Sequence, residues 1–474
     1  MHLGLDLGTS GLKALLIDGD QSVIAEATAP LTVQRPHDGW SEQDPASWIA
    51  ACRTALDQLG DLSAVRSVGL SGHMHGATLV GEGGGALRPC LLWNDTRAHA
   101  EAAEMDDAEA RRITGNIVFP GFTAPKAEWV RRHEPETFAR TRLVLLPKDF
   151  LRLWLTGEAW SDMSDASGTA WLDVGARDWS DAMLARSGLS RDHMPRLAEG
   201  SAPAGRIAAA VARETGLPEG IPVAGGGGDN AASAVGVGVV TPGTAFASLG
   251  TSGVLFAASD GYAPAPETAV HSFCHALPGT WHQMGVILAA TDALEWLARL
   301  TGRSAADLTG GLGALRAPGR AAFLPYLGGE RTPHNDAQVR GAFAGLGHAD
   351  GSEELARAVI EGVAFAFADC ADALAATGTK IERLIGVGGG TRSDYFCAAI
   401  ATALGVPLEL PVAGDFGGAF GAARLAMMAD GADPSIAAIP PIARTVGPDP
   451  ALRDAFAEGH ARHRRLYDRL KDHR

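Results

Sequence analysis

Cysteine is scarce in this chain. The 474 residues include five cysteines, which are scattered and form no CxxC pair: Cys52, Cys90, Cys274, Cys370 and Cys397. An odd number at such spacings excludes a disulfide framework, and the missing CxxC argues against a structural zinc cluster. The cysteine pattern therefore predicts a protein of a reducing compartment, the cytoplasm.

Positive charge is also in short supply. Lys and Arg total 40 against 55 Asp and Glu, which gives a net charge of −15, and only five of the basic residues are lysine. We therefore expect neither nucleic acid nor an anionic membrane as the main partner. The apolar stretch 358–376 carries three acidic residues, so no membrane span is expected. Asp6 lies inside the first apolar run, which is unlike a signal peptide.

No GK[ST] triplet occurs in the sequence, which excludes a Walker A nucleotide site. Instead, strand and helix patterns alternate. Residues 2–7, 12–18 and 22–28 predict three strands of a meander, so the first glycine-rich turn joins two strands and does not open a helix. Asp44-Pro45 predicts a helix start, and residues 351–377 predict a long helix. This mixture predicts an α/β protein.

One short stretch of sequence occurs twice. Leu7-Gly8-Thr9-Ser10-Gly11 recurs as Leu249-Gly250-Thr251-Ser252-Gly253, about half the chain later. If each copy begins a domain, the chain comprises residues 1–240 and residues 241–474, joined near the Gly- and Val-rich residues 235–242. Chance repetition of five small residues is the alternative.

The first copy has the composition of a phosphate site. Glycines on both sides of a tight turn let successive backbone N–H groups point at one anion, so Gly8, Thr9 and Ser10 are predicted to bind phosphate. Asp6, on the strand before the turn, can hold Mg²⁺, and Lys13 is a further candidate for a phosphate contact. A plain glycine-rich hairpin with a solvent-facing lysine is the alternative.

Four consecutive glycines precede Asp229. Gly225–Gly228 would let a ligand approach the backbone, and they present one carboxylate followed by Asn230. This arrangement suits a general base aimed at a hydroxyl. The alternative is that Asp229 caps a helix beginning at Asn230. A second glycine run, 388–390, follows a predicted strand at 384–387 and would form either a flat surface for an adenine ring or a structural turn.

Two histidine pairs have spacings seen in metal sites. His73 and His75 flank Met74, and His271 and His275 have the i, i+4 spacing of one helix face. No third ligand motif lies near either pair, so hydrogen bonding to a polar sugar is the better interpretation for His75.

Taken together, the motifs resemble the FGGY carbohydrate kinases, and within that family the xylulose kinases. The resemblance extends over nearly the whole chain. It is carried by residues 5–11 (LDLGTSG), 40–45 (WSEQDP), 74–78 (MHGAT), 92–95 (LWND), 121–126 (GFTAPK), 146–149 (LPKD), 228–232 (GDNAA), 248–253 (SLGTSG), 271–275 (HSFCH), 329–334 (GERTPH) and 388–390 (GGG).

The resemblance implies two actin-like, ribonuclease H-type α/β domains with the active site in the cleft between them. It implies ATP-dependent phosphorylation of D-xylulose to D-xylulose 5-phosphate, with ATP and Mg²⁺ as cofactors. By matching motifs, it implies the following roles: Asp229 as catalytic base, Met74, His75 and Asn230 as sugar-binding residues, Asp6 as the metal-linked acid, Thr251 in the second phosphate loop, and Gly389 with Gly390 in the adenosine segment.

Some positions depart from the family pattern. His73 stands where Gln is common, and Phe396, Ala398 and Thr402 replace the usual Trp, Gln and Asp. His73 leaves open a kinase for another ketose or pentitol, such as ribulose or arabinitol. Because the implied fold also serves sugar-sensing proteins, a non-catalytic sensor of sugar and ATP is a second alternative. In each case the expected partner is a small sugar, and a homodimer is compatible with the sequence.

Overall fold

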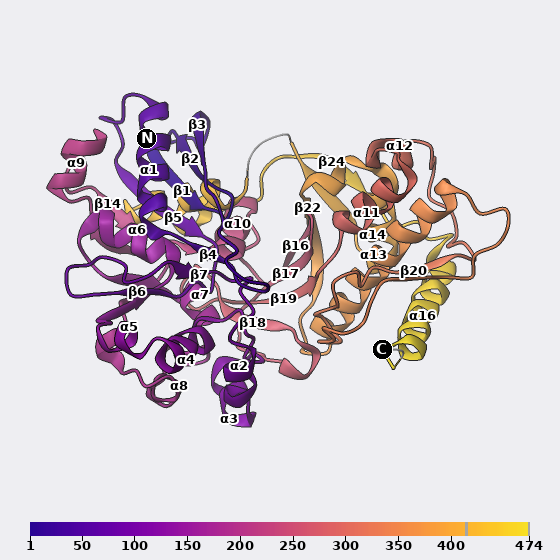
Figure 1. Cartoon of the computed structure of the whole chain (residues 1–474). Helices are drawn as coiled ribbons and strands as arrows, with labels where there is room; N and C mark the ends of the chain where they lie inside the picture. The colour runs from indigo at the N-terminus through magenta and orange to yellow at the C-terminus, as the bar shows by residue number, and fades with distance from the viewer. Residues whose placement is uncertain (413–415, 473–474) are drawn as a thin grey trace.

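The computed structural model describes residues 1–412 and 416–472. Two seven-stranded sheets organise the molecule, and Figure 1 shows them in two halves that lie side by side. The N-terminus lies in one half, and the C-terminal helix lies at the far side of the other. The structure is thus mixed α/β with two sheets, as the sequence predicts.

Each sheet is built on a β-meander extended by parallel strands. The first has the order β13-β14-β5-β1-β2-β3, with β15 added on β5; the second has the order β18-β19-β17-β16-β22-β23-β24. Their strands are β1 His2–Leu7, β2 Gly11–Ile17, β3 Val23–Pro30, β5 Ser67–Gly72, β13 Pro203–Arg206, β14 Pro222–Ala224 and β15 Gly227–Gly228, and then β16 Gly243–Leu249, β17 Gly253–Ser259, β18 His271–Cys274, β19 Trp281–Ile287, β22 Ile381–Val387, β23 Leu408–Pro411 and β24 Ile442–Val446.

The two sheets repeat one topology. In the first, β1 pairs antiparallel with β2 and parallel with β5; in the second, β16 pairs antiparallel with β17 and parallel with β22. The turn Gly8–Ser10 and the turn Gly250–Ser252 therefore occupy equivalent places. The repeated LGTSG stretch reflects this repeated topology and is not a chance match.

Helices and short strand pairs complete the two halves. The short pairs are β4 Glu42–Gln43 with β7 Cys90–Leu91, β6 Thr78–Val80 with β8 Leu143–Leu145, β9 Trp160–Asp162 with β12 Arg196–Ala198, β10 Leu172–Asp173 with β11 Asp178–Trp179, and β20 Ala322–Leu324 with β21 Ala342–Ala344. The helices are α1 Pro45–Leu59, α2 His99–Met105, α3 Ala108–Thr114, α4 Thr123–His133, α5 Pro135–Ala139, α6 Pro147–Thr156, α7 Met163–Ala166, α8 Asp181–Arg186, α9 Ala209–Thr215, α10 Asp229–Val237, α11 Thr291–Thr301, α12 Ala305–Gly310, α13 Ser352–Ala375, α14 Asp394–Leu404, α15 Gly418–Ala429 and α16 Arg453–Leu470.

Local signals placed several of these elements correctly. Helix α1 begins at Pro45, and the Asp44 carboxylate accepts a hydrogen bond from the Ala46 N–H at 2.9 Å, as the Asp-Pro pair predicts. Helix α13 spans most of the predicted residues 351–377 and lies in the largest buried apolar cluster, beside strands of the second sheet.

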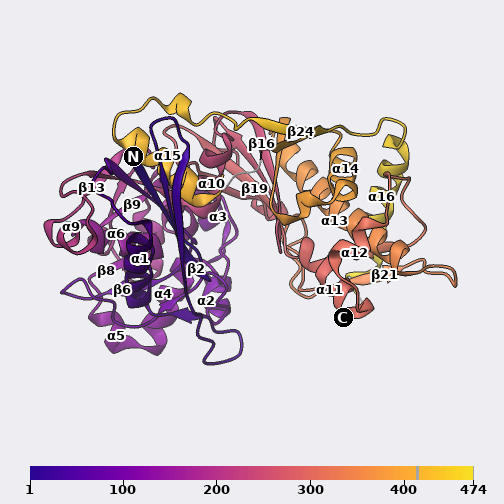
Figure 2. The same ribbon diagram turned by 90° about the horizontal axis from the view of Figure 1, so that it is seen from above.

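Helix α15 returns to the first sheet late in the chain, and Figure 2 shows it in the half that holds the N-terminus. It packs directly on the strands because Gly4 and Gly69 have no side chains; a Cβ on either would overlap backbone atoms of α15. The division into residues 1–240 and 241–474 stays a proposal. Helix α15 belongs to the second of these segments by sequence and to the first sheet by packing.

Candidate active site

A cleft of about 820 Å³ lies between the two sheets. Its walls come from both halves of the chain, and α10 lies between them (Figure 1). Residues on the side of the first sheet include Lys13, Glu26, Asn230 and Ser233, and those on the side of the second sheet include Phe246, Ser248, Gly386, Gly388, Thr391 and Arg392. Asn230 and Lys13 therefore line one cleft with the segment that follows β22.

The first glycine-rich turn joins β1 to β2, the strand that carries the cleft residue Lys13. The Gly8 N–H donates to the Gly11 carbonyl at 3.0 Å, so this amide is used inside the hairpin. Within the described residues the amides of Thr9 and Ser10 have no hydrogen-bond partner, which leaves them able to bind an anion. The Lys13 ammonium pairs with Glu26 at 2.9 Å, and its phosphate role stays a prediction.

Two residues that the sequence analysis gave no role hold this turn. The Gln43 side-chain amide donates to the Thr9 carbonyl at 3.0 Å, and the Trp93 indole N–H donates to the Thr9 hydroxyl at 3.0 Å. Trp93 remains 48% exposed although it is a large apolar residue. The sequence marked both residues only as members of the WSEQDP and LWND motifs. Their contact with the turn becomes visible only in the folded structure.

The second turn lies on the N-terminal end of α11. The Thr251 carbonyl accepts from the N–H of Ala290 at 2.9 Å and of Asp292 at 3.2 Å, and the Gly250 carbonyl accepts from Thr291 at 3.0 Å. Thr251 itself is exposed, as a phosphate-binding residue requires.

The glycines after β22 differ in what surrounds them. Gly388 has a φ of 91° and its added Cβ would lie 2.8 Å from the Leu249 backbone, whereas Gly389 faces open space. Gly390 is buried, and an added Cβ would lie 2.8 Å from the Leu249 side chain. The adenosine role of Gly389 and Gly390 stays a prediction. Close packing on the second turn accounts for Gly388 and Gly390.

Asp229 is the first residue of α10. The helix cap is Gly228, so the hypothesis that Asp229 caps a helix beginning at Asn230 is wrong. The Asp229 carboxylate accepts hydrogen bonds from the Asn230 backbone N–H at 2.7 Å and side-chain amide at 3.0 Å. Burial and the nearby Asp6 carboxylate raise the pKa of Asp229 to about 6, although the bonds from Asn230 oppose the shift. A carboxyl group with this pKa can accept a proton near neutral pH.

Asp6 lies at the end of β1, beside the start of α15. Its carboxylate accepts from the Ser71 hydroxyl at 2.8 Å, and an added Cβ on Gly418 would lie 2.8 Å from its oxygens. Because its charge raises the pKa of Asp229, the two carboxylates are close enough to repel each other. A divalent cation would relieve that repulsion, so the residues fit the predicted Mg²⁺ site.

The glycines before Asp229 serve a different purpose from the one predicted. A Cβ on Gly225 or Gly226 would overlap the carbonyl of Glu199 or Leu70, and Gly226 has a φ of 78°. Gly225 and Gly226 are therefore glycines because neighbouring protein backbone packs against them, whereas the approach of a ligand at Gly227 and Gly228 stays a prediction.

Met74 connects this run to the predicted sugar-binding histidine. It is 5% exposed, and its side chain lies against Gly228 on one side and Gly168 on the other. The Gly168 carbonyl accepts a hydrogen bond from His75 Nδ1 at 2.7 Å. Met74 thus lies between His75 and the residue preceding Asp229, which places both predicted residues at one site.

His75 is held in an unusual conformation. Its φ is 70°, and its carbonyl accepts hydrogen bonds from Thr123 Oγ1 and Lys126 Nζ, both at 3.0 Å. Burial lowers the pKa of His75 to about 3, so the ring is neutral. Because Nδ1 donates to Gly168, Nε2 carries the lone pair and can accept a hydrogen bond from a hydroxyl.

Aromatic rings surround His75. Phe122 stacks on it at 4.7 Å between ring centroids, and Phe119 contacts Phe122 at 5.5 Å. The Arg331 guanidinium, from the other half of the chain, lies 3.8 Å from the centroid of the Phe119 ring. Arg331 was quoted only as part of the GERTPH motif. Its position near the predicted sugar-binding residues depends on tertiary packing that the motif does not encode.

Neither histidine pair belongs to a cluster of three potential metal ligands among the described residues. His271 lies on strand β18, with His275 just beyond its end, so the helical i, i+4 spacing does not apply. His73 is 3% exposed and faces Trp48, with a ring-centroid distance of 6.0 Å. Among the described residues, the one cluster of three potential metal ligands is Asp149, Asp162 and Asp165. None of the described helices is long and apolar enough to cross a membrane.

Comparison with known proteins shows the family of this chain. The model of the FGGY family of carbohydrate kinases, N-terminal domain, matches residues 1–236, and the C-terminal domain model matches residues 245–429. The xylulose kinase of Escherichia coli K12 is 49% identical over 482 residues, covering 99% of both chains, and that of Bacillus subtilis is 34% identical, covering 90% of this chain and 88% of its own.

Solved structures show the same fold. A protein named a xyloylose kinase from Brucella ovis is 58% identical with a TM-score of 0.97, covering 99% of both chains. The glycerol kinase of Plasmodium falciparum, at 17% identity, has a TM-score of 0.90 over 98% of this chain and 97% of its own. The predicted fold class, two actin-like α/β domains with a cleft between them, is confirmed. This chain belongs to the FGGY family of carbohydrate kinases.

Proposed function

We propose that this protein phosphorylates D-xylulose at the C5 hydroxyl, using ATP and forming D-xylulose 5-phosphate. The observation that carries the proposal is the position of Asp229 at the start of α10. It follows Gly228, which lies against Met74 beside His75, and it precedes Asn230, which lines the cleft. The relatives named as xylulose kinases, which match over nearly all of this chain, support the choice of sugar.

Asp229 would accept the proton of the C5 hydroxyl as that oxygen attacks the γ-phosphorus. The new bond joins O5 to phosphorus, and the bond from phosphorus to the β,γ-bridging oxygen breaks, so ADP leaves. The transition state of such a transfer needs little covalent help, so the protein contributes mainly position and charge. His75 Nε2 would accept a hydrogen bond from a sugar hydroxyl and orient the ketose.

The two glycine-rich turns would bind the phosphates of ATP. The amides of Thr9 and Ser10 have no hydrogen-bond partner among the described residues, and Thr251 is exposed at the equivalent turn of the second sheet. Asp6 would hold Mg²⁺, which neutralises phosphate charge when bound. The segment Gly386–Gly388 with Arg392 lines the cleft where the adenosine would lie.

The test is ADP release with MgATP across a panel of acceptors: D-xylulose, L-xylulose, D-ribulose, L-ribulose, glycerol, gluconate, D-arabinitol and xylitol. We expect kcat/KM for D-xylulose to exceed that of every other acceptor by at least about tenfold, with weak ATP hydrolysis in the absence of sugar. Preference for another polyol would overturn the choice of substrate. Sugar binding without turnover would overturn the kinase assignment in favour of a sensor.

The acid limb of the pH profile tests the base. The general base must be ionised, and the pKa of Asp229 is raised to about 6. We therefore expect kcat/KM for the sugar to fall about tenfold per pH unit below pH 6 and to level off above pH 7. Residual turnover of Asp229→Asn should lack this limb. A profile of unchanged shape in that variant would show that another group titrates.

A further inference from the structure

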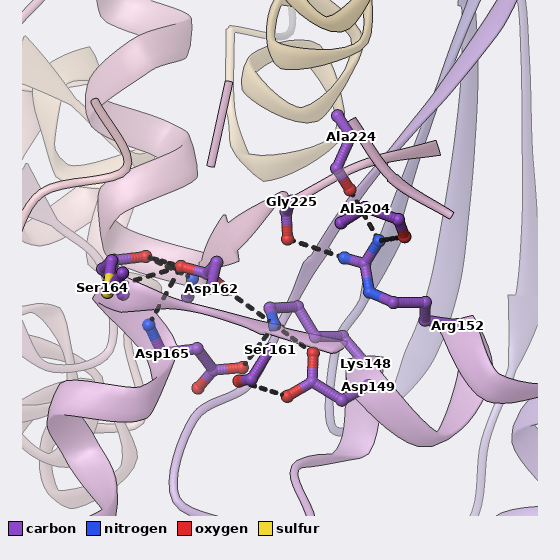
Figure 3. Close-up of polar contacts among 12 residues, drawn as sticks. Lys148, Asp149, Arg152, Ser161, Asp162, Ser164, Asp165, Ala204, Ala224 and Gly225 are labelled. Carbon is purple, nitrogen blue, oxygen red and sulfur yellow. Dashed lines mark hydrogen bonds and ion pairs between the residues drawn. The ribbon is translucent and has the colours of Figure 1, made fainter. Parts of the chain in front are cut away.

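A cluster of buried charged residues lies directly behind the glycine run (Figure 3). Lys148 and Asp149 are in the first turn of α6, Asp162 ends β9 and Asp165 lies in α7. The side chains of these four residues are fully buried. The Lys148 ammonium lies 2.5 Å from Asp149, 2.7 Å from Asp162 and 3.2 Å from Asp165.

This cluster already contains its cation. The three carboxylates could together hold a metal ion, but the Lys148 ammonium contacts all of them and occupies that place. Burial opposes a charge on Lys148, yet the surrounding carboxylates raise its pKa above the usual value, so it stays protonated. Burying so many ionisable groups costs free energy unless each group is paired and hydrogen-bonded. We therefore ask which neighbouring segments the cluster holds in place, and the hydrogen bonds to those segments give the answer.

Two residues beside this cluster bond to the glycine run: Ser164, which is hydrogen-bonded to Asp162, and Arg152, whose guanidinium lies near the same carboxylates. Asp162 Oδ1 accepts from the Ser164 hydroxyl at 2.5 Å, and the oxygen of that hydroxyl accepts from the Gly228 N–H at 3.1 Å. Arg152, one turn further along α6, donates to the Gly225 carbonyl at 2.6 Å and to the Ala224 carbonyl at 2.7 Å. The two contacts therefore hold both ends of the run that leads into Asp229.

The orientation of the Ser164 hydroxyl follows from its partners. Asp162 Oδ1 also accepts from the Ser164 backbone N–H at 2.8 Å, and the opposite oxygen of Asp162 pairs with Lys148. The Gly228 N–H can only donate, so the serine oxygen accepts from it and gives its own proton to Asp162 Oδ1. The carboxylate that pairs with Lys148 therefore fixes the position of the hydroxyl group that bonds to the cap of α10.

We propose that Ser164, oriented by Asp162 and Lys148, is a positioning residue that holds Asp229 in place through the Gly228 N–H, with Arg152 holding the other end of the run. This inference rests on the proposed role of Asp229 as the base. None of these residues touches substrate in the proposed reaction. They act through the backbone of residues 225–228, which leads into Asp229.

Ser161 supplies a matched control. Its hydroxyl donates to Asp149 at 2.6 Å in the same cluster, and it is as deeply buried as Ser164, but within the described part of the chain it makes no hydrogen bond to the glycine run. Both Ser164→Ala and Ser161→Ala remove one hydroxyl from a charged, buried network. A merely structural role predicts equal effects of the two changes.

We expect Ser164→Ala to lower kcat about tenfold with the KM of ATP unchanged. A small shift of the catalytic carboxylate slows proton transfer, whereas the residues that bind the nucleotide stay in place. Ser161→Ala should change kcat by less than about twofold. Melting temperatures of both variants show whether each folds and by how much each is destabilised. Equal losses of kcat in the two variants, or a kcat of Ser164→Ala within twofold of the parent, would overturn the inference.

The Asp229→Asn background separates positioning from general damage. If Ser164 acts through Asp229, then Ser164→Ala should have almost no further effect on the residual kcat of Asp229→Asn. A second tenfold loss there would show that Ser164 acts independently of the base. Near-normal turnover of Asp229→Asn alone would instead overturn the assignment of the base, and this inference with it.

Discussion

Asp229→Asn is expected to lower kcat by about 10²–10⁴-fold while the protein remains folded, since that range is the usual contribution of a general base. The amide keeps the shape of the carboxyl group and can still accept from the Asn230 N–H, which the structure places 2.7 Å away. What it loses is the ability to take the proton of the attacking hydroxyl. The measurement is ADP release at saturating sugar and MgATP, with circular dichroism as the check on folding.

Although Asp229→Asn should lower kcat, it should not lower the thermal stability of the protein above pH 6. Burial and the Asp6 charge raise the pKa of Asp229, so the ionised carboxylate is disfavoured in the folded state. The folded protein therefore binds the proton of this carboxyl group more tightly than the unfolded chain does. The stability that this proton contributes is lost as pH rises through about 6. At pH 8 the neutral Asn should therefore melt no lower than the parent.

The control for this variant is Asp181→Asn. Asp181 is the first residue of α8, the position that Asp229 holds in α10, but it is exposed and pairs with Arg191. Its substitution should leave kcat unchanged. A loss of turnover in Asp181→Asn, or its retention in Asp229→Asn, would contradict the assignment of the base.

Local chemistry explains why parts of this structure were predictable. A tight turn such as Gly8–Gly11, or a helix start such as Asp44-Pro45, is specified by residues that contact each other along the chain, so the residue pattern indicates the conformation directly. The repeat of LGTSG indicated a repeated hairpin for the same reason.

What the sequence did not indicate depends on packing between distant segments. Gly225 and Gly226 look like residues cleared for a ligand, yet Glu199 and Leu70 are what approach them. Likewise, the LPKD motif contains Lys148 and Asp149, but nothing in its spacing shows that Asp162 completes their ion pairs. The residues within a motif are therefore visible in the sequence, whereas the contacts that distant segments make with them are not.

Packing between distant segments also constrains helix α15, where adding a single methyl group should strongly reduce stability. Gly421→Ala is expected to lower the free energy of unfolding by about 2–3 kcal/mol, the cost of overpacking a close contact. An added Cβ at Gly421 would overlap the Ala232 carbonyl oxygen of α10 and lie 3.0 Å from the Gly236 nitrogen. Both neighbours are backbone atoms of a helix, so they cannot move aside as the end of a flexible side chain can.

The expected loss of stability is opposite to the usual effect of Gly→Ala in a helix. In an exposed helix, Gly→Ala stabilises by as much as about 1 kcal/mol, because alanine has the higher helix propensity. Gly310→Ala is the control: it lies in α12 with no heavy atom within 4 Å of the added Cβ, so its urea midpoint should stay equal or rise. If Gly421→Ala also raised the midpoint, then α10 and α15 would not touch as described. Because α10 begins with Asp229, displacement of that helix should lower kcat along with stability, whereas Gly310→Ala should leave kcat unchanged.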